Sequence, residues 1–198
     1  EKDMSSTAPE GYTDVAPWVV TDDTGAFLDF VTAAFGGREL ARVPVEDGSI
    51  GHGEIRVGNT VVLAFDRRPE WPVMPSLLRV FVADADATMA AAVAAGARVI
   101  TPAADSAWGD RGGRVRDPFG NIWWGVSRRE QVAPEEAWQR LGQPVYADAM
   151  RDAQETLDVE LSGRATGRAS APVAPSPACS TGPRPRQSRL TSGPSSEI

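Results

Sequence analysis

The sequence is poor in the residues and runs that build disulfides and membrane spans. Its 198 residues include a single cysteine, Cys179, which excludes an intrachain disulfide. No apolar run approaches the roughly 18 residues that a membrane-spanning helix needs. The first apolar run is a short strand behind polar residues, so we expect no signal peptide. Together these absences predict a soluble, cytoplasmic protein without a membrane partner.

The charge is unevenly distributed along the chain. The net charge of -7 argues against binding to nucleic acid or to anionic membranes. Residues 162–198 run against this trend, because they carry five arginines and one glutamate. This tail has no aromatic residue and is dense in proline, serine, glycine and alanine, so we predict that it is disordered. We expect disorder in residues 1–11 as well.

The rest of the chain contains one pattern twice, at an offset of about 60 residues. Residues 12–68 and 76–128 each read as a strand that ends in aspartates, an alanine-rich helix that ends at glycine, and further strands. This repeat predicts an α+β domain over residues 12–130. Residues 131–161 follow as C-terminal helices.

The expected elements come from apolar periodicity and from turn residues. In the first half, a helix starts near Asp22 to Thr24 and ends at Gly36 and Gly37, with strands over 38–43, 50–57 and 60–65. In the second half, a helix over 86–95 places Met89, Ala92 and Val93 inward, and strands include 99–100, 114–116 and 122–126. Two helices end the ordered part of the chain. The first begins at Pro134 and places Trp138 and Leu141 inward, and the second spans 145–161.

Two stretches of the chain resemble a known superfamily. The turn Asp117–Asn121 with Ile122 and Trp123, the wider stretch from Trp108, and His52–Gly58 are similar to the vicinal oxygen chelate superfamily, in its PhnB-like branch. That superfamily contains glyoxalase I, extradiol dioxygenases, fosfomycin-resistance enzymes and bleomycin-resistance proteins. The resemblance implies paired βαβββ modules that form a cupped, eight-stranded mixed sheet around a cavity.

The resemblance also implies four positions where metal-dependent members hold an ion. By register with the repeated motifs, these positions are Ala16, Leu63, Leu77 and Trp124. None of these side chains offers the imidazole, carboxylate or thiolate that a divalent ion requires. We therefore expect no metal site and no cofactor.

His52 and Glu54 are the candidate catalytic residues. His52 is the only histidine in the chain, and side chains two apart in a strand share a face. The pair has four interpretations: a general base with an orienting carboxylate, two ligands of an incomplete metal site, a structural hydrogen bond, or a contact with a partner subunit. No serine or cysteine nucleophile is indicated beside it.

Aromatic side chains are the stronger indication of a binding site. Trp124 stands at the fourth metal position, so we expect it to face the cavity while Trp123 faces a helix or a partner subunit. Arg111 and Arg114 could hold an anionic substituent or pair with Asp110 and Asp117. The alternative is that the tryptophans fill the core and a dimer interface. The predicted ligand-binding set is Trp18, Leu63, Phe65, Trp71, Leu77, Trp108, Arg111, Arg114 and Trp124.

Three functions remain open at this point. The favoured hypothesis is a metal-free protein that sequesters an aromatic or hydrophobic small molecule, with antibiotic resistance as one role. The alternative is a lyase, isomerase or dioxygenase-type enzyme of the same superfamily that uses His52 and Glu54, with or without a divalent metal. The third is a scaffold with a vestigial pocket. Exposed sheet edges also predict a homodimer, with residues 134–161 covering an edge or crossing to the partner.

Overall fold

The computed structural model describes residues 8–9 and 11–163. The predicted disorder of residues 1–11 and of the basic tail therefore falls almost wholly outside the described residues. None of the helices in the described part is both long enough and apolar enough to cross a membrane.

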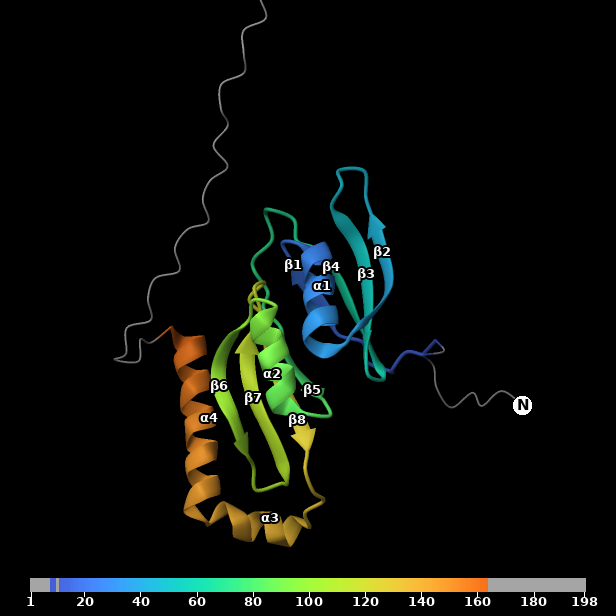
Figure 1. Cartoon of the computed structure of the whole chain (residues 1–198). Coiled ribbons are helices and arrows are strands. Elements are labelled where there is room, and N and C mark those ends of the chain that lie inside the picture. Colours follow the sequence, from blue (N-terminus) through green and yellow to red (C-terminus); the bar gives the residue numbers. More distant parts are fainter. Residues whose placement is uncertain (1–7, 10, 164–198) are drawn as a thin grey trace, which may run out of the picture. The chain divides into compact units, whose positions relative to one another are not determined.

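The first half forms a four-stranded mixed sheet with one helix (Figure 1). The strand order is β1-β4-β3-β2, in which β1 is parallel to β4 and the other pairs are antiparallel. Its elements are β1 (Trp18–Thr21), α1 (Thr24–Phe35), β2 (Arg38–Pro44), β3 (Ile50–Val57) and β4 (Thr60–Asp66).

The second half repeats this topology. The strand order is β5-β8-β7-β6, in which β5 is parallel to β8 and the other pairs are antiparallel. Its elements are β5 (Leu77–Phe81), α2 (Ala85–Ala94), β6 (Arg98–Asp105), β7 (Asp110–Arg116) and β8 (Ile122–Arg128). Two further helices, α3 (Pro134–Leu141) and α4 (Pro144–Ser162), follow, and α4 lies against β6 (Figure 1).

Both module helices begin with the same local device. The side chain of Asp23 accepts a hydrogen bond from the backbone of Ala26, and Asp84 does the same for Ala87. Each aspartate thereby satisfies a backbone donor that the first helical turn leaves free. The aspartates that end the first strand of each module are therefore N-caps, which explains why they recur. α1 ends at Gly36, whose φ of 65° favours glycine.

Aromatic rings join the two halves in one core. Trp123 is 2 % exposed, and its ring centroid lies 4.5 Å from that of Phe35 and 6.4 Å from that of Phe27. Phe27 also meets Phe119 edge to face at 5.9 Å. Residues of α1 and residues of the second sheet thus bury one another, so the core is continuous across both modules.

The turn before β8 is held by one buried carboxylate. Asp117 accepts hydrogen bonds from the backbone of Phe119 and Asn121, the amide of Asn121 and the indole Nε1 of Trp123. Burial is the largest influence on its pKa and raises it, against these hydrogen bonds, which lower it. Asp117 therefore fixes the turn and the orientation of Trp123 together.

The predicted fold class is confirmed, with one refinement. The eight strands form two separate four-stranded sheets in the chain. Strand β7 starts at Asp110, four residues earlier than expected, because its glycines lie in the strand rather than in a loop.

Two expected core positions are wrong. Trp138 is 72 % exposed, and Ala137 is the buried residue of α3. Val93 is exposed at 44 %, whereas Met89 and Ala92 are buried as predicted. Both errors occur on short helices that have apolar or small residues on more than one side, where periodicity alone does not fix the buried face.

Candidate functional site

Each sheet has one face covered by its helix and one face turned away from it. A side chain at Gly53 would meet Thr24 and Leu28 of α1, and one at Gly113 would meet Met89 of α2. Because strand residues alternate, the neighbours of these glycines point to the opposite side. We call these opposite sides the first open face (β1 to β4) and the second open face (β5 to β8).

The first open face carries a chain of aromatic contacts. The ring of Trp18 lies 5.7 Å from that of His52 and 5.3 Å from that of Phe65. Phe65 in turn meets Trp71 edge to face at 5.9 Å. Trp18 is 48 % exposed and Trp71 is 37 % exposed, while Leu63 on the central strand β4 is buried. The structure thus brings five of the predicted residues to one surface with accessible indole rings.

His52 and Glu54 form a hydrogen-bonded pair on the same face. His52 Nε2 lies 2.7 Å from Glu54 Oε1, and the hydroxyl of Tyr12 donates to Glu54 Oε2 at 2.6 Å. The hydrogen bond from Tyr12, followed by that from His52, lowers the pKa of Glu54. The hydrogen bond between Tyr12 and Glu54 also raises the pKa of the Tyr12 hydroxyl. Glu54 is therefore held as a carboxylate that orients the imidazole.

This arrangement resembles a base with an orienting carboxylate in its geometry. Among the described residues, however, the partners of the pair are Tyr12 and the ring of Trp18. The hydroxyl of Tyr12 is already donated to Glu54, and the indole ring of Trp18 is not a nucleophile. The pair can accept or donate a proton, and the ring contacts beside it are made by Trp18 and Phe65.

The second open face carries a row of side chains in register across three strands. Arg79 pairs with Trp124, and Trp124 pairs with Arg114. The guanidinium carbons of Arg79 and Arg114 lie 4.6 and 4.4 Å from the centroid of the Trp124 ring. The Arg79 guanidinium also lies 4.9 Å from the ring of Phe81. Two cations therefore stack on one indole, which fixes the ring in place.

Arg114 lies deep in this row. It is 7 % exposed and donates to Thr101 Oγ1 at 3.3 Å and to the carbonyl of Ala153 in α4 at 2.7 Å. Its Nε is buried without a hydrogen-bond partner in the described structure. Burial, and then the charge of Arg79, lowers the pKa of Arg114.

Helix α4 covers the β6 side of the second open face. Thr156 of α4 hydrogen-bonds to Thr101 at 2.7 Å, and Glu160 pairs with Arg98 and with Arg116. Sequence reasoning left open whether the C-terminal helices cover an edge or cross to a partner. In the chain, α4 lies against β6, which is the edge strand of its sheet.

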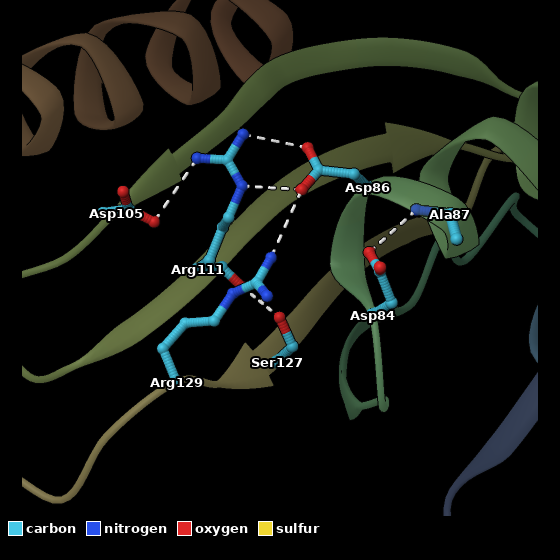
Figure 2. Close-up of polar contacts among 7 residues, drawn as sticks. All are labelled: Asp84, Asp86, Ala87, Asp105, Arg111, Ser127 and Arg129. Carbon is cyan, nitrogen blue, oxygen red and sulfur yellow. Dashed lines mark hydrogen bonds and ion pairs between the residues drawn. The ribbon is translucent and has the colours of Figure 1, made fainter.

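Arg111 points to the helix-covered side instead. Figure 2 shows its guanidinium between two acidic side chains, bidentate to Asp86 at 2.7 and 2.9 Å and 3.3 Å from Asp105. Arg129 also reaches Asp86, at 3.5 Å. These ion pairs tie β7 to the first turn of α2, and they differ from the Asp110 and Asp117 pairing considered from the sequence.

The remaining predicted residues lie at the margins of the second sheet. Leu77 is 59 % exposed at the start of β5, and Trp108 is 45 % exposed in the turn before β7. Sequence reasoning missed Tyr12, Arg79 and Phe81. The repeat contained a signal for Arg79, because register places it where the first module has Trp18.

A family comparison now gives this geometry a context. The family model of the Glyoxalase/Bleomycin resistance protein/Dioxygenase superfamily matches residues 13–124. The chain belongs to this superfamily. Uncharacterized protein Rv0887c of Mycobacterium tuberculosis (strain ATCC 25618 / H37Rv) is 32 % identical over 160 residues, which cover 75 % of this chain and 85 % of the relative. Uncharacterized protein Mb0911c of Mycobacterium bovis is equally similar, with 95 % of its length covered.

Two solved structures are similar to this chain over the two modules. TioX from Micromonospora sp. ML1 is 27 % identical, with a TM-score of 0.50, and the match covers 58 % of this chain and 97 % of TioX. A Bacillus cereus protein named as a putative 3-demethylubiquinone-9 3-methyltransferase, PhnB protein, is 12 % identical with a TM-score of 0.46, and the match covers 58 % of this chain and 99 % of that protein. The mycobacterial matches extend further than the superfamily domain. Their share of this chain is about 148 residues, so they reach α4 even if they begin at residue 1.

The positions at which metal-dependent superfamily members are expected to hold an ion do not fit one here. Leu63 is buried between strands, and Trp124 is stacked between two arginines. In the described ranges, no three histidine, cysteine, aspartate or glutamate side chains are grouped to hold a metal ion. These hydrocarbon and indole side chains supply no donor atoms for a divalent ion.

Proposed function

We propose that this superfamily member is a metal-free protein that binds and sequesters an aromatic or hydrophobic small molecule. The observation that carries the proposal is the exposed aromatic surface formed by Trp18, Phe65 and Trp71 on the first open face. Exposed indole rings that are fixed by neighbouring rings offer large apolar contact area at a low cost in side-chain entropy. Sequestration of a toxic compound would make antibiotic resistance the biological role, and the single cysteine favours a cytoplasmic location.

The proposal includes a homodimer that completes the binding cavity. In the described structure, β1 and β5 each pair with one neighbouring strand, so one edge of each remains open. Leu77 and Phe81 project from β5 with 59 % and 64 % exposure. A second copy that adds its β5 edge to β1 would join the two open faces on one side of an eight-stranded sheet. Curling of that sheet would close the faces around a cavity and bury this apolar surface.

Tryptophan fluorescence and thermal stability test the binding function directly. The purified protein is titrated with a panel of flat aromatic antibiotics and metabolites, and at least one compound should quench fluorescence and raise the melting temperature. Trp18→Ala should weaken binding of that compound by roughly tenfold or more, because an anchoring aromatic is lost.

Trp138→Ala is the matched control, since this indole is 72 % exposed on α3, outside both open faces. It should leave the affinity unchanged. If no compound in the panel binds, or if the two substitutions weaken binding equally, sequestration on the first open face is refuted.

The second candidate function is catalysis by the same superfamily fold. The hydrogen bond of 2.7 Å between His52 and Glu54 favours it, because this pair can transfer a proton to or from a bound molecule. The test is product analysis by mass spectrometry with each compound that binds. His52→Gln should abolish any turnover while leaving binding within about twofold; unchanged compound after long incubation would exclude this candidate.

A further inference from the structure

Positive charge is in excess on the second open face. Arg79, Arg114 and Arg128 come from three neighbouring strands. Asp110 is the acid that pairs with Arg79 and Arg128. Its two carboxylate oxygens bind Arg79 Nη2 at 3.1 Å and Arg128 Nε at 2.9 Å. One carboxylate therefore serves two guanidiniums, and Arg114 forms no ion pair with a carboxylate in the described part of the chain.

The burial of Arg114 makes this excess costly. Removing a cation from water without a paired anion is unfavourable, because neutral hydrogen-bond acceptors replace only part of its hydration. Arg114 has two such acceptors, Thr101 Oγ1 and the Ala153 carbonyl, while its Nε has none in the described structure. A second cation, Arg79, shares the same indole. Such an arrangement is stabilised when an anion binds nearby.

The equivalent row of the first module has the opposite character. There, the register places Trp18, Leu63 and Glu54 in line across three strands. Glu54 stands where the second module has Arg114, and its two oxygens are already bound by Tyr12 and His52. The apolar and aromatic surface thus belongs to the first open face, and the unneutralised positive charge belongs to the second.

We propose that the ligand is an aromatic compound with a carboxylate or similar anionic group, and that Arg79 beside Trp124 binds this group. Arg79 is the accessible member of the row, with its side chain 41 % exposed. The hydrogen bond that the structure shows for it uses Nη2 alone, which leaves donors for a carboxylate. Arg114 strengthens the site by its charge from the other side of the row. This inference rests on the proposed binding function, including the dimer that brings the second open face to the first, and it specifies the ligand class.

Two matched probes separate the inference from the function beneath it. Isothermal titration calorimetry compares 2-naphthoate with 2-naphthamide, which have the same ring system but differ in charge. Wild-type protein should bind 2-naphthoate about tenfold more tightly. Arg79→Gln should abolish this preference by weakening 2-naphthoate binding far more than 2-naphthamide binding. Arg38→Gln, an equal charge change on exposed β2, should keep the preference.

Arg114 is tested by a pair of variants, because it also anchors α4. Arg114→Gln should reduce the preference for 2-naphthoate, and Arg114→Lys should retain it, since lysine keeps the charge. If Arg114→Gln does not fold, Arg79→Gln decides. Equal binding of both probes, with no effect of Arg79→Gln, overturns the anionic ligand class and leaves the binding function intact. Failure of both probes to bind counts against both.

Discussion

At the scale of single residues, the hydrogen-bonding groups around Asp117 explain why a carboxylate is required there. Asp117 is 4 % exposed, and all four of its partners are donors. Asp117→Asn turns one carboxylate oxygen into an amide that faces donors, so one or more buried groups lose their acceptor. We expect the free energy of unfolding to fall by about 1–3 kcal/mol, measured by urea denaturation. Glu46→Gln, at an exposed turn, should change it by less than about 0.5 kcal/mol.

The glycine pair Gly113 and Gly125 offers a second test at this scale, because the two residues are register partners in adjacent strands. A Cβ at Gly113 would lie 2.5 Å from Met89 Sδ and 2.7 Å from the Thr101 carbonyl oxygen. A Cβ at Gly125 would meet nothing within 4 Å. Gly113→Ala should therefore lower the free energy of unfolding by about 1–3 kcal/mol in urea titrations. Gly125→Ala should cost far less, and equal losses would contradict the assigned position of α2.

At the scale of elements, periodicity and capping predicted most of the fold. The recurring aspartates, the glycine helix ends and the turns predicted the order of helices and strands in both modules, although β6 and β7 are longer than expected. Strand alternation placed Trp123 in the core and Trp124 on the other face. Contacts between distant elements were beyond such reasoning. Arg114 is bound by the Ala153 carbonyl of α4, and no local pattern marks a backbone carbonyl as the partner of an arginine.

Glu160 of α4 contributes to the docking of this helix through ion pairs with Arg98 of β6 and Arg116 of β7. Arg98, and then Arg116, lowers the pKa of Glu160 below its usual 4.5. A carboxylate with a lowered pKa contributes stability above its unfolded pKa and loses it as pH falls through the folded pKa. Amide hydrogen exchange of α4 should therefore accelerate below about pH 4.5, after correction for the intrinsic rate.

Glu160→Gln should reproduce this acceleration at neutral pH, by roughly fivefold, because the two ion pairs are lost. Glu155→Gln changes an exposed acid of the same helix and should leave exchange as in the wild type. Protection that is the same in both variants would mean that Thr156 and the apolar contacts of α4 are sufficient to hold it.

At the scale of the whole molecule, the question is how the two modules are joined. The resemblance to the superfamily implied a single cupped sheet, yet the chain forms two sheets whose first strands each keep an open edge. A sequence repeat specifies the fold of each module, but the joining of module edges is decided by how the copies pack. In this chain, the contacts of α1 with α2 and Trp123 join the modules through the helix-covered sides. The two open faces and the free edges of β1 and β5 are the surfaces that the proposed dimer would use.

Mass in solution tests this dimer. Light scattering after gel filtration should give twice the chain mass of 21.0 kDa at micromolar concentrations. Leu77→Asp with Phe81→Asp places charges on an exposed strand edge, so the chain should fold but run as a monomer. Val93→Asp adds a charge at a similarly exposed position on α2 and should leave the dimer intact. Since the proposed cavity uses both open faces, the monomeric variant should also bind aromatic ligands at least tenfold more weakly. A wild-type protein that stays monomeric yet binds with full affinity would place the site on the first open face alone.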